Sequence, residues 1–265
     1  MTIEYGVIYL LLGAFAGLLA GLFGVGGGLV IVPVLVYLFS VQGFDSGVLV
    51  HLAIGTSLAT IIVTSLSSVV AHHKHAAVRW DIVRQLSPGI IIGALLGAVI
   101  ADLLSSVYLR RFFAVFEWLV GVQLLLNMRS RASRVLPVGW ALFFAGKTIG
   151  FVSSIVGIGG GTMTVPFLVW CNIKMRQAVA TSSACGLPIA IAGAAGFVVM
   201  GQTAQASING SFGYFYLPAF AGIVVTSVLF APLGAWLAHR LPAALLKRIF
   251  GLFLIGFGSY MFLNE

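Results

Sequence analysis

One ten-residue stretch decides the fold, and it occurs twice: GVGGGLVIVP at residues 24–33 and GIGGGTMTVP at residues 157–166. Each copy lies inside an apolar run of about the length that spans a bilayer. Glycine is costly within a helix, and the residue before a proline is disfavoured in the helical conformation. We therefore predict that a helix ends near Gly24 and near Gly157, and that a new one begins between the last glycine and the proline. Such breaks are tolerated in hydrocarbon only where protein or a wet cavity covers them, so each should line a site.

Composition places the chain in a membrane. Hydrophobic residues make up 60% of its 265 residues, charged residues only 8%, and its mean hydropathy is +1.13. A chain of this kind cannot keep an ordinary globular surface in water, and no polar stretch is long enough for a soluble domain. The net charge is +8, but all except one of the fourteen Lys and Arg residues lie in short loops or at segment ends. These positions indicate topology signals and lipid headgroup contact, and we expect no nucleic-acid partner.

The apolar runs predict an all-α polytopic membrane protein built by duplication. The runs cover about 5–39, 48–71, 86–103, 109–127, 137–172, 177–199, 213–238 and 244–263, and the glycines interrupt the first and the fifth. Residues 13–36 match residues 146–169 at a fixed offset of 133, with ten of 24 positions identical. The match continues with small gaps to the end of each half. We therefore divide one integrated transmembrane domain into repeats at 1–130 and 131–265.

The basic residues indicate how the two repeats lie in the membrane. If each interrupted run crosses once, six basic residues fall on one side and seven on the other, which is no bias. If each run enters and returns, as a re-entrant hairpin or as two short spans, one side receives only Arg110 and Arg111. The other side then collects Lys74, Arg79, Arg84, Arg129, Arg131, Arg134, Lys174, Arg176, Arg240, Lys247 and Arg248. The positive-inside rule favours this second arrangement, which makes the repeats inverted and puts both termini outside.

The breaks also predict an anion site. A helix that resumes after three glycines begins with N–H groups that lack a partner and with the positive end of its dipole. Glycines let a ligand approach those amides, so no basic residue is required. The alternative, close helix packing, fits better the upstream ridges Gly13/Gly17/Gly21 and Gly146/Gly150/Ser154.

Hydroxyl groups follow each break. Thr56 and Ser57 in the first half match Thr181 and Ser182 in the second, and Thr60, Thr64 and Ser68 continue the helical face of Thr56. Hydroxyl donors suit the oxygens of a small oxyanion and cost less to bury than charges. Ser and Thr in membrane helices also bond their own backbone carbonyls, so contact with substrate remains one of two interpretations.

Two ionisable residues lie within the spans, Glu117 and Lys147, and neither has a charged counterpart in the other half. Such groups are expensive in lipid and are functional candidates by default. Glu117 could carry a coupling proton, and Lys147 could raise the positive potential of the cavity. A structural ion pair or snorkelling to an interface explains them equally well.

No cofactor, metal or catalytic set is expected. The tract His72, His73, Lys74 and His75 has no paired cysteines or carboxylates and fits a cap on the basic side of the membrane. Cys171 and Cys185 lack metal-like spacing, and their role stays open. Because no nucleophile with a base, P-loop or zinc-protease motif is present, we expect a protein that is not an enzyme.

The doubled Gly-x-Gly-Gly-Gly-x-x-x-x-Pro motif resembles the TauE/SafE family of sulfite exporters over essentially the whole chain. Each copy lies in the first apolar run of its half and precedes a Thr-Ser segment. The resemblance implies movement of small sulfur-containing anions, such as sulfite, thiosulfate or organosulfonates, across the bacterial cytoplasmic (inner) membrane. The motif positions it carries over are Gly24, Gly26, Gly27, Gly28 and Pro33, and Gly157, Gly159, Gly160, Gly161 and Pro166.

The sequence therefore predicts a secondary transporter that holds its anion between the breaks and works by alternating access. The expected substrate-binding set adds Thr56, Ser57, Lys147, Thr181 and Ser182 to the motif positions, with Glu117 as the candidate for proton coupling. A passive anion channel is the first alternative. A membrane-embedded enzyme or a partner subunit is the second. The particular anion, the direction of transport and the oligomeric state stay open.

Overall fold

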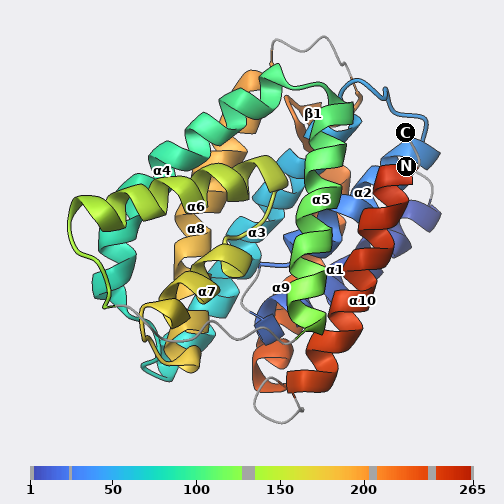
Figure 1. Ribbon diagram of the computed structural model, residues 1–265. Helices are drawn as coiled ribbons and strands as arrows, with labels where there is room; N and C mark the ends of the chain where they lie inside the picture. Colours follow the sequence, from blue (N-terminus) through green and yellow to red (C-terminus); the bar gives the residue numbers. More distant parts are fainter. Residues whose placement is uncertain (1–2, 24–25, 127–134, 203–207, 238–242, 264–265) are drawn as a thin grey trace.

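The computed structural model describes residues 3–23, 26–126, 135–202, 208–237 and 243–263 (Figure 1). These residues form ten helices and one short hairpin. The elements are α1 (Ile3–Phe23), α2 (Gly28–Val41), α3 (Leu49–Lys74), α4 (Trp80–Leu103), α5 (Ser106–Leu125), α6 (Trp140–Val156), α7 (Gly161–Trp170), α8 (Met175–Met200), β1 (Ser211–Phe212), β2 (Phe215–Tyr216), α9 (Leu217–Leu237) and α10 (Ala243–Leu263).

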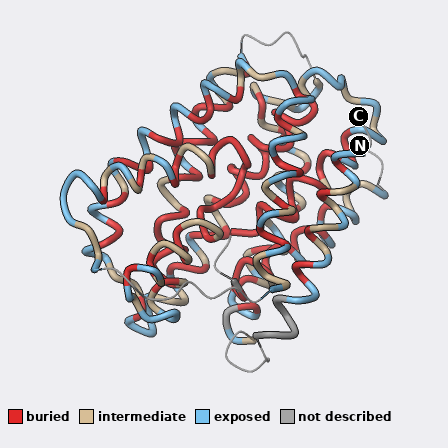
Figure 2. The backbone as a smooth tube through the Cα atoms, in the orientation of Figure 1, coloured by how far each residue is buried: buried red, intermediate tan, exposed pale blue. Residues whose placement is uncertain are grey.

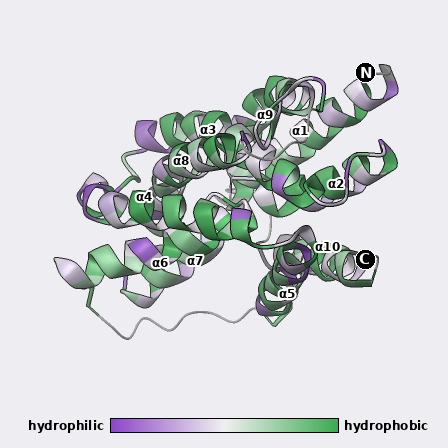
Figure 3. Ribbon diagram, turned by 90° about the horizontal axis from the view of Figure 1, so that it is seen from above, coloured by the Kyte–Doolittle hydropathy of each residue, from purple (hydrophilic) through white to green (hydrophobic). Residues whose placement is uncertain are grey.

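The helices fit a polytopic membrane protein. Five of those in the described residues, α1, α3, α4, α8 and α9, are long and apolar enough to cross a bilayer. Hydrophobic residues dominate the helices (Figure 3), and large apolar side chains such as Leu119, Leu229 and Leu252 face outward and are exposed. Buried positions gather on the central helices (Figure 2), and α3 is buried over most of its length. An apolar exterior around a packed centre is the surface that lipid requires.

Both interrupted runs break where the glycines predicted. The first run stops at Phe23 and resumes with α2 at Gly28, and the second stops at Val156 and resumes with α7 at Gly161. Gly27 and Gly160, which cap the new helices, have φ values of 84° and 78°. A side chain at such a left-handed angle is strained, so glycine is required there.

Each interrupted run folds back toward the end from which it started. The Gln42 side chain, just after α2, donates a 2.8 Å hydrogen bond to the hydroxyl of Tyr9, near the start of α1. Figures 1 and 3 show this return, and Figure 1 shows α7 turning back from α6 in the same way. The start of α1 and the end of α10 lie at one end of the bundle.

The upstream glycine ridge of the first half serves close helix packing, as predicted, and the structure shows that its partner is α9. Gly13 lies against Ile223, and a Cβ atom on Gly17 would lie 2.6 Å from the carbonyl oxygen of Ser227. The residue numbers rise together along the two helices, so α1 and α9 run parallel.

The ridge of the second half packs on α4 in the same way. A Cβ atom on Gly146 would lie 2.5 Å from the carbonyl oxygen of Leu86, and Gly150 lies against Ile90. Helices α6 and α4 therefore also run parallel. Small residues allow this close approach of two backbones.

The central helices α3 and α8 cross in opposite directions. Ser68 contacts Ser183, whereas Leu58 lies against Gly193, so the residue numbers rise on one helix as they fall on the other. Helix α4 runs parallel to α8, because the N–H of Arg79 reaches Thr181 and Ala98 lies against Gly196. Helix α9 runs parallel to α3, because the N–H of Tyr216 reaches Thr56 and Ser67 approaches Val228. Helices α4 and α9 therefore run in opposite directions. Their parallel partners α6 and α1 therefore oppose each other too.

One element was not predicted. The antiparallel hairpin β1–β2 pairs Ser211 with Tyr216 and Phe212 with Phe215 immediately before α9. The apolar run that we read as starting at residue 213 includes half of this hairpin, and the helix itself begins at Leu217.

Candidate functional site at the paired helix breaks

The two breaks meet in the centre of the protein. A Cβ atom on Gly26 would lie 3.3 Å from the Cα atom of Gly159, and one on Gly28 would collide with the carbonyl oxygen of Gly157. All four glycines are buried. Sequence reasoning found both breaks, but their contact across the halves appears only in the folded chain. Gly24 lies outside the described residues.

At the second break, several successive amide groups find no acceptor among the described residues. The N–H groups of Met163 and Thr164 donate to the carbonyl oxygen of Gly160, at 3.1 and 2.7 Å. The N–H groups of residues 159–162 have no acceptor within the described part of the chain. The same holds at the first break for the N–H groups of Gly28 and Leu29. These amides are the donors that an anion at a helix N-terminus would use.

Pro33 and Pro166 lie inside the new helices, at the sixth residue of α2 and of α7. A proline has no N–H, so it accepts a place in the helix only by leaving a carbonyl oxygen one turn earlier without its usual partner. The prolines thus shape the helices that follow the breaks and do not contribute an amide to the site.

Ser57 links the two halves at the breaks. Its hydroxyl donates a 2.9 Å hydrogen bond to the carbonyl oxygen of Gly157, and both residues are buried. Its counterpart Ser182 is equally buried, and its hydroxyl has no partner within the described residues. Both predicted serines are therefore buried, but only Ser57 has a hydrogen bond to a break in the described residues.

Thr56 and Thr181 receive hydrogen bonds from backbone amides in equivalent places. The N–H of Tyr216, just before α9, donates to Thr56 Oγ1 at 3.0 Å, and the N–H of Arg79, just before α4, donates to Thr181 Oγ1 at 3.1 Å. Both hydroxyls thus hold the loop that leads into a neighbouring helix. Both halves therefore use the threonine hydroxyl to accept a backbone hydrogen bond from this loop.

The rest of the hydroxyl stripe on α3 is largely satisfied by protein. Thr60 bonds to the carbonyl oxygen of Ser57 at 2.7 Å. Thr64 bonds to those of Gly26 and Ile61, both at 3.3 Å, and Ser68 bonds to Ser183 at 3.3 Å. The alternative that we gave for these residues, a hydrogen bond to a carbonyl of their own helix, is therefore found for Thr60 and Thr64.

The structure does not bring Lys147 to the breaks. Lys147 is half-buried on α6, nine residues before the helix ends, which places its backbone about 14 Å from Val156 along the axis. Glu117 is fully buried on α5, and its carboxyl oxygens have no hydrogen-bond partner in the described residues. Among the described residues, the ion pair that forms joins Arg79 and Asp81. Glu117 and Lys147 therefore do not neutralise each other.

Hydroxyls that sequence reasoning did not select surround the second break. Ser153, Ser154, Thr162 and Thr164 have hydroxyl oxygens that are buried without a partner in the described residues. A comparison of the two repeats could have identified them, because these hydroxyls occur in the second half only. At the offset of 133, their first-half counterparts Ala20, Gly21, Leu29 and Ile31 have no hydroxyl at all.

A second feature that was missed lies near the end of the bundle where α1 begins. The buried His51 Nε2 contacts the carbonyl oxygens of Ala101 and Leu104 at 3.0 and 3.1 Å, and its Nδ1 lies 3.3 Å from Ser106 Oγ. The ring of His51 stacks on Tyr214, whose hydroxyl donates a 3.0 Å hydrogen bond to Asp102. This network ties α3 to the end of α4 and to the hairpin loop.

No metal site is built by the described residues, which contain no group of three or more His, Cys, Asp or Glu side chains suitably placed. His73, in the histidine tract, accepts a 3.2 Å hydrogen bond from the indole N–H of Trp80. Cys171 and Cys185 are both buried, and neither forms a disulfide bond.

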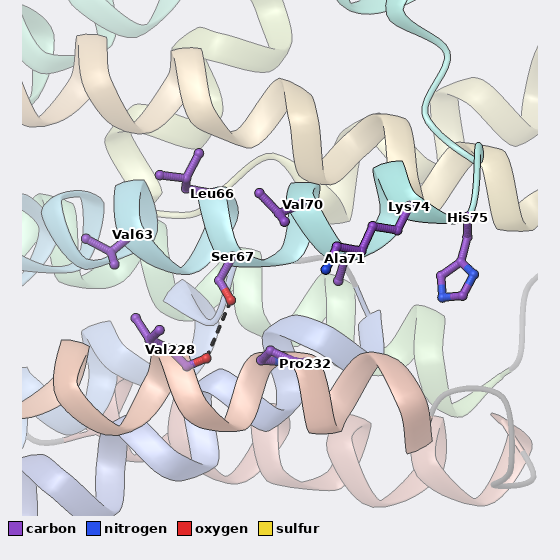
Figure 4. Close-up of a pocket in the computed structure, with 9 residues that line it drawn as sticks. All are labelled: Val63, Leu66, Ser67, Val70, Ala71, Lys74, His75, Val228 and Pro232. Carbon is purple, nitrogen blue, oxygen red and sulfur yellow. Dashed lines mark hydrogen bonds between the residues drawn. The ribbon is translucent and has the colours of Figure 1, made fainter.

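A pocket of about 490 Å³ opens between α3 and α9 (Figure 4). Lys74 and His75 lie at one end of it. Its walls are mainly apolar and consist of Val63, Leu66, Ser67, Val70, Ala71, Lys74, His75, Val228 and Pro232.

Comparisons with known proteins agree with the geometry of a transporter. The model of the family described as "Sulfite exporter TauE/SafE" matches residues 9–261. The chain is 38% identical over 261 residues to a "Probable membrane transporter protein" of Haemophilus influenzae, which covers 97% of this chain and 98% of that protein. A "Probable membrane transporter protein" of Bacillus subtilis is 28% identical over 92% of this chain and 89% of its own length. No solved structure matches.

Proposed function

Because the chain belongs to the sulfite exporter TauE/SafE family of membrane transporters, we propose that it is a secondary transporter for a small sulfur-containing anion. Sulfite, thiosulfate and organosulfonates are the substrate class. The observation that carries this proposal is the meeting of two buried helix breaks, Gly26–Gly28 and Gly157–Gly161, at which amide groups have no acceptor within the described residues. Paired broken helices are a recurrent way to hold a substrate within the membrane.

The arrangement of the helices supports two inverted repeats with a boundary near residue 130. Exchanging the halves converts each major packing pair into another: α1 on α9 becomes α6 on α4, and α3 on α9 becomes α8 on α4. The pairs α3 with α8 and α5 with α10 convert into themselves. Helices α1 and α6 oppose each other, as inversion requires.

Alternating access follows from this symmetry. The anion sits at the breaks, and each re-entrant pair, α1–α2 or α6–α7, belongs to one half. Rocking one half against the other would open the breaks first to one side and then to the other. In the described residues, the halves meet at the breaks through glycine backbones, the Ser57 hydroxyl and apolar side chains such as Val32 and Ile54 against Gly157. The contact can therefore rearrange without separating an ion pair.

Glu117 is the candidate for proton coupling. It lies on α5, which packs against α10, and its buried carboxyl oxygens have no hydrogen-bond partner in the described residues. Ionisable side chains within membrane helices are functional candidates by default. If Glu117 exchanges its proton during the cycle, anion movement is coupled to the proton gradient. A passive channel would need no such group.

The membrane is proposed to be the bacterial cytoplasmic membrane, with both termini outside. Lys74 at the end of α3 and Lys174 before α8 lie at the end opposite the start of α1 (Figure 1). The positive-inside rule assigns that end to the cytoplasm.

The test is flux of [35S]sulfite into proteoliposomes that contain the purified protein, with and without an imposed pH gradient. We expect saturable uptake that a pH gradient accelerates and that unlabelled thiosulfate or an organosulfonate competes. Uptake no faster than in protein-free liposomes, for every sulfur anion tried, would contradict the proposal. Uptake that never saturates would favour the channel.

A further inference from the structure

The pocket between α3 and α9 combines apolar walls with one basic end. Apolar side chains of both helices form most of its lining, and Lys74 and His75 lie where α3 ends. Both basic residues are exposed. Figure 4 shows the Lys74 side chain running back along α3 toward Ala71, which brings its charge over the apolar part of the pocket. A ligand that fits both parts has an apolar chain and an anionic group.

Small side chains and a proline create this space. Ser67 and Ala71 lie one turn apart on the same face of α3, and Val228 and Pro232 line the pocket from α9. Pro232 has no N–H, so the Val228 carbonyl oxygen loses its usual helical donor, and the Ser67 hydroxyl approaches that oxygen at 3.5 Å. The two helices leave about 490 Å³ between them, within the range of roughly 300–1,000 Å³ that is usual for ligand pockets.

The pocket has about the depth of one lipid leaflet. Val63 and Lys74, toward its two ends, lie about 16 Å apart along α3 at a rise of about 1.5 Å per residue. Half of the hydrocarbon core of a bilayer is about 15 Å thick. Leu66 and Val70 are 52% and 50% exposed, so this side of the pocket faces the lipid. An acyl chain therefore fits the pocket from the headgroup region to near the midplane.

The second half has apolar residues at the sequence-equivalent place. Counted from the matched Thr-Ser pairs, Lys74 corresponds to Val199 and His75 to Met200, at the end of α8. In an inverted repeat, this end of α8 lies at the opposite face of the membrane. Positive charge at one of two equivalent places is expected when the ligand belongs to one leaflet.

Helix packing also differs between the two places. Gly196 of α8 corresponds to Ala71, and a Cβ atom on Gly196 would lie 2.5 Å from the Cβ atom of Ala98 on α4. Helix α4 therefore contacts α8 directly at this level, whereas the Ala71 side chain borders the pocket. The open groove and the basic end thus occur together on α3.

We propose that this pocket binds an anionic phospholipid of the cytoplasmic leaflet, with one acyl chain between α3 and α9 and the phosphate at Lys74 and His75. Phosphate oxygens accept hydrogen bonds from an ammonium group and from an imidazole N–H. Anionic lipids attract basic residues at the cytoplasmic surface, whereas a soluble anion would gain nothing from the apolar walls. The inference goes beyond the proposed function, from which it takes only the orientation in the membrane.

The test compares two phospholipids with identical acyl chains, titrated into the purified full-length protein in detergent and followed by native mass spectrometry. Phosphatidylglycerol carries one net negative charge, and phosphatidylcholine carries none. We expect phosphatidylglycerol to bind at least about fivefold more tightly, because one basic residue near an anionic lipid contributes about this factor. It should also raise the melting temperature more, since it binds the folded protein. Equal affinity for the two lipids would overturn the headgroup assignment.

Charge variants locate the headgroup. Lys74→Gln combined with His75→Gln should lower the affinity for phosphatidylglycerol about fivefold or more and leave that for phosphatidylcholine nearly unchanged. The control is Lys174→Gln, which removes an exposed charge at the same end of the bundle from a residue outside the lining of the pocket. An equal loss in the control and in the double variant would show that the lipid is held by general surface charge, against the proposal.

A filled pocket locates the acyl chain. Ala71→Phe should weaken binding of both lipids about tenfold, the effect of withdrawing about two methylene groups from burial. The control Ala195→Phe adds the same ring at an exposed position of α8 and should bind both lipids as the wild type does. Undiminished binding in Ala71→Phe would mean that the chain lies elsewhere. Flux of sulfite tests the proposed transport separately, so failure of the lipid site leaves that function in place.

Discussion

The hydroxyl of Ser57, in the first half, donates a 2.9 Å hydrogen bond to the carbonyl oxygen of Gly157, which ends α6 in the second half. The bond crosses the boundary between the halves at the point where both helices are broken. A carbonyl at the end of a helix needs a donor from elsewhere, and no water is at hand in a membrane interior. Ser57 supplies it, so the end of α6 is held by the other half.

Removing this bond should loosen the contact between the halves. Ser57→Ala leaves the Gly157 carbonyl oxygen buried without that donor, which should cost about 1–3 kcal/mol and lower the melting temperature of the detergent-purified protein. The control Ser67→Ala removes a half-buried hydroxyl that only approaches the Val228 carbonyl oxygen at 3.5 Å. An equal change in both variants would show that the Ser57 bond contributes nothing specific.

A larger side chain at the break should abolish transport. Gly160→Leu forces a side chain to a φ of 78° and into Ile189, which combines backbone strain with overpacking of about 1–3 kcal/mol. We expect normal membrane insertion and no sulfite flux in proteoliposomes.

The matched control is Gly43→Leu, because Gly43 has a similar φ of 75° but nothing within 4 Å of its Cβ position. It should transport normally. Normal flux in Gly160→Leu would show that the break is not part of the site.

Neutralising Glu117 should distinguish a proton-coupled carrier from a passive anion channel. Glu117→Gln keeps the size of the buried side chain but cannot exchange a proton. In a proton-coupled carrier, a pH gradient should no longer accelerate sulfite uptake, while exchange of sulfite for sulfite continues. If the pH gradient still accelerates uptake, Glu117 does not carry the proton.

The Tyr214 hydroxyl should stabilise the hairpin in a pH-dependent way. Burial, and then the neighbouring Asp102 carboxylate, raises the pKa of Tyr214 to about 12 from its usual 10.0. A raised pKa favours the protonated phenol in the folded state. Its contribution is therefore complete below about pH 10 and is lost as the pH rises toward 12.

Tyr214→Phe removes the bond to Asp102 and should lower stability by about 1 kcal/mol at neutral pH. Its stability should also fall less between pH 10 and 12 than that of the wild type, as measured by chemical denaturation. Parallel curves for the two proteins over that range would contradict the assignment.

Labelling in intact cells tests the topology. Gly43→Cys places a thiol in the turn after α2, and His75→Cys places one just after α3, at the opposite end of the bundle (Figure 1). A membrane-impermeant maleimide should label the first in intact cells and the second only after permeabilisation. The native Cys171 and Cys185 are buried and provide the unlabelled background. The reverse pattern would place both termini inside.

The sequence determined the local events of this fold. Glycine entropy and the constraint before proline act within a few residues, so the ends of α1 and α6 and the starts of α2 and α7 could be placed from the motif alone. Length and hydropathy likewise predicted the membrane helices. The hairpin before α9 was not predicted, because strands of two residues are too short to show an alternating pattern of apolar and polar residues. The hydrogen-bond network of His51 was not predicted, because a single histidine in an apolar segment does not indicate which residues it contacts.

Only the tertiary structure decided which groups share the site. Gly26 lies against Gly159, and Ser57 bonds to Gly157, because two distant segments pack together, and a single sequence carries no record of that pairing. The same packing assigned Thr56 and Thr181 to the support of neighbouring loops and left Lys147 away from the breaks. Whether a buried hydroxyl is satisfied depends on every helix around it. The sequence could therefore name the breaks, while packing decided which side chains remain free beside them.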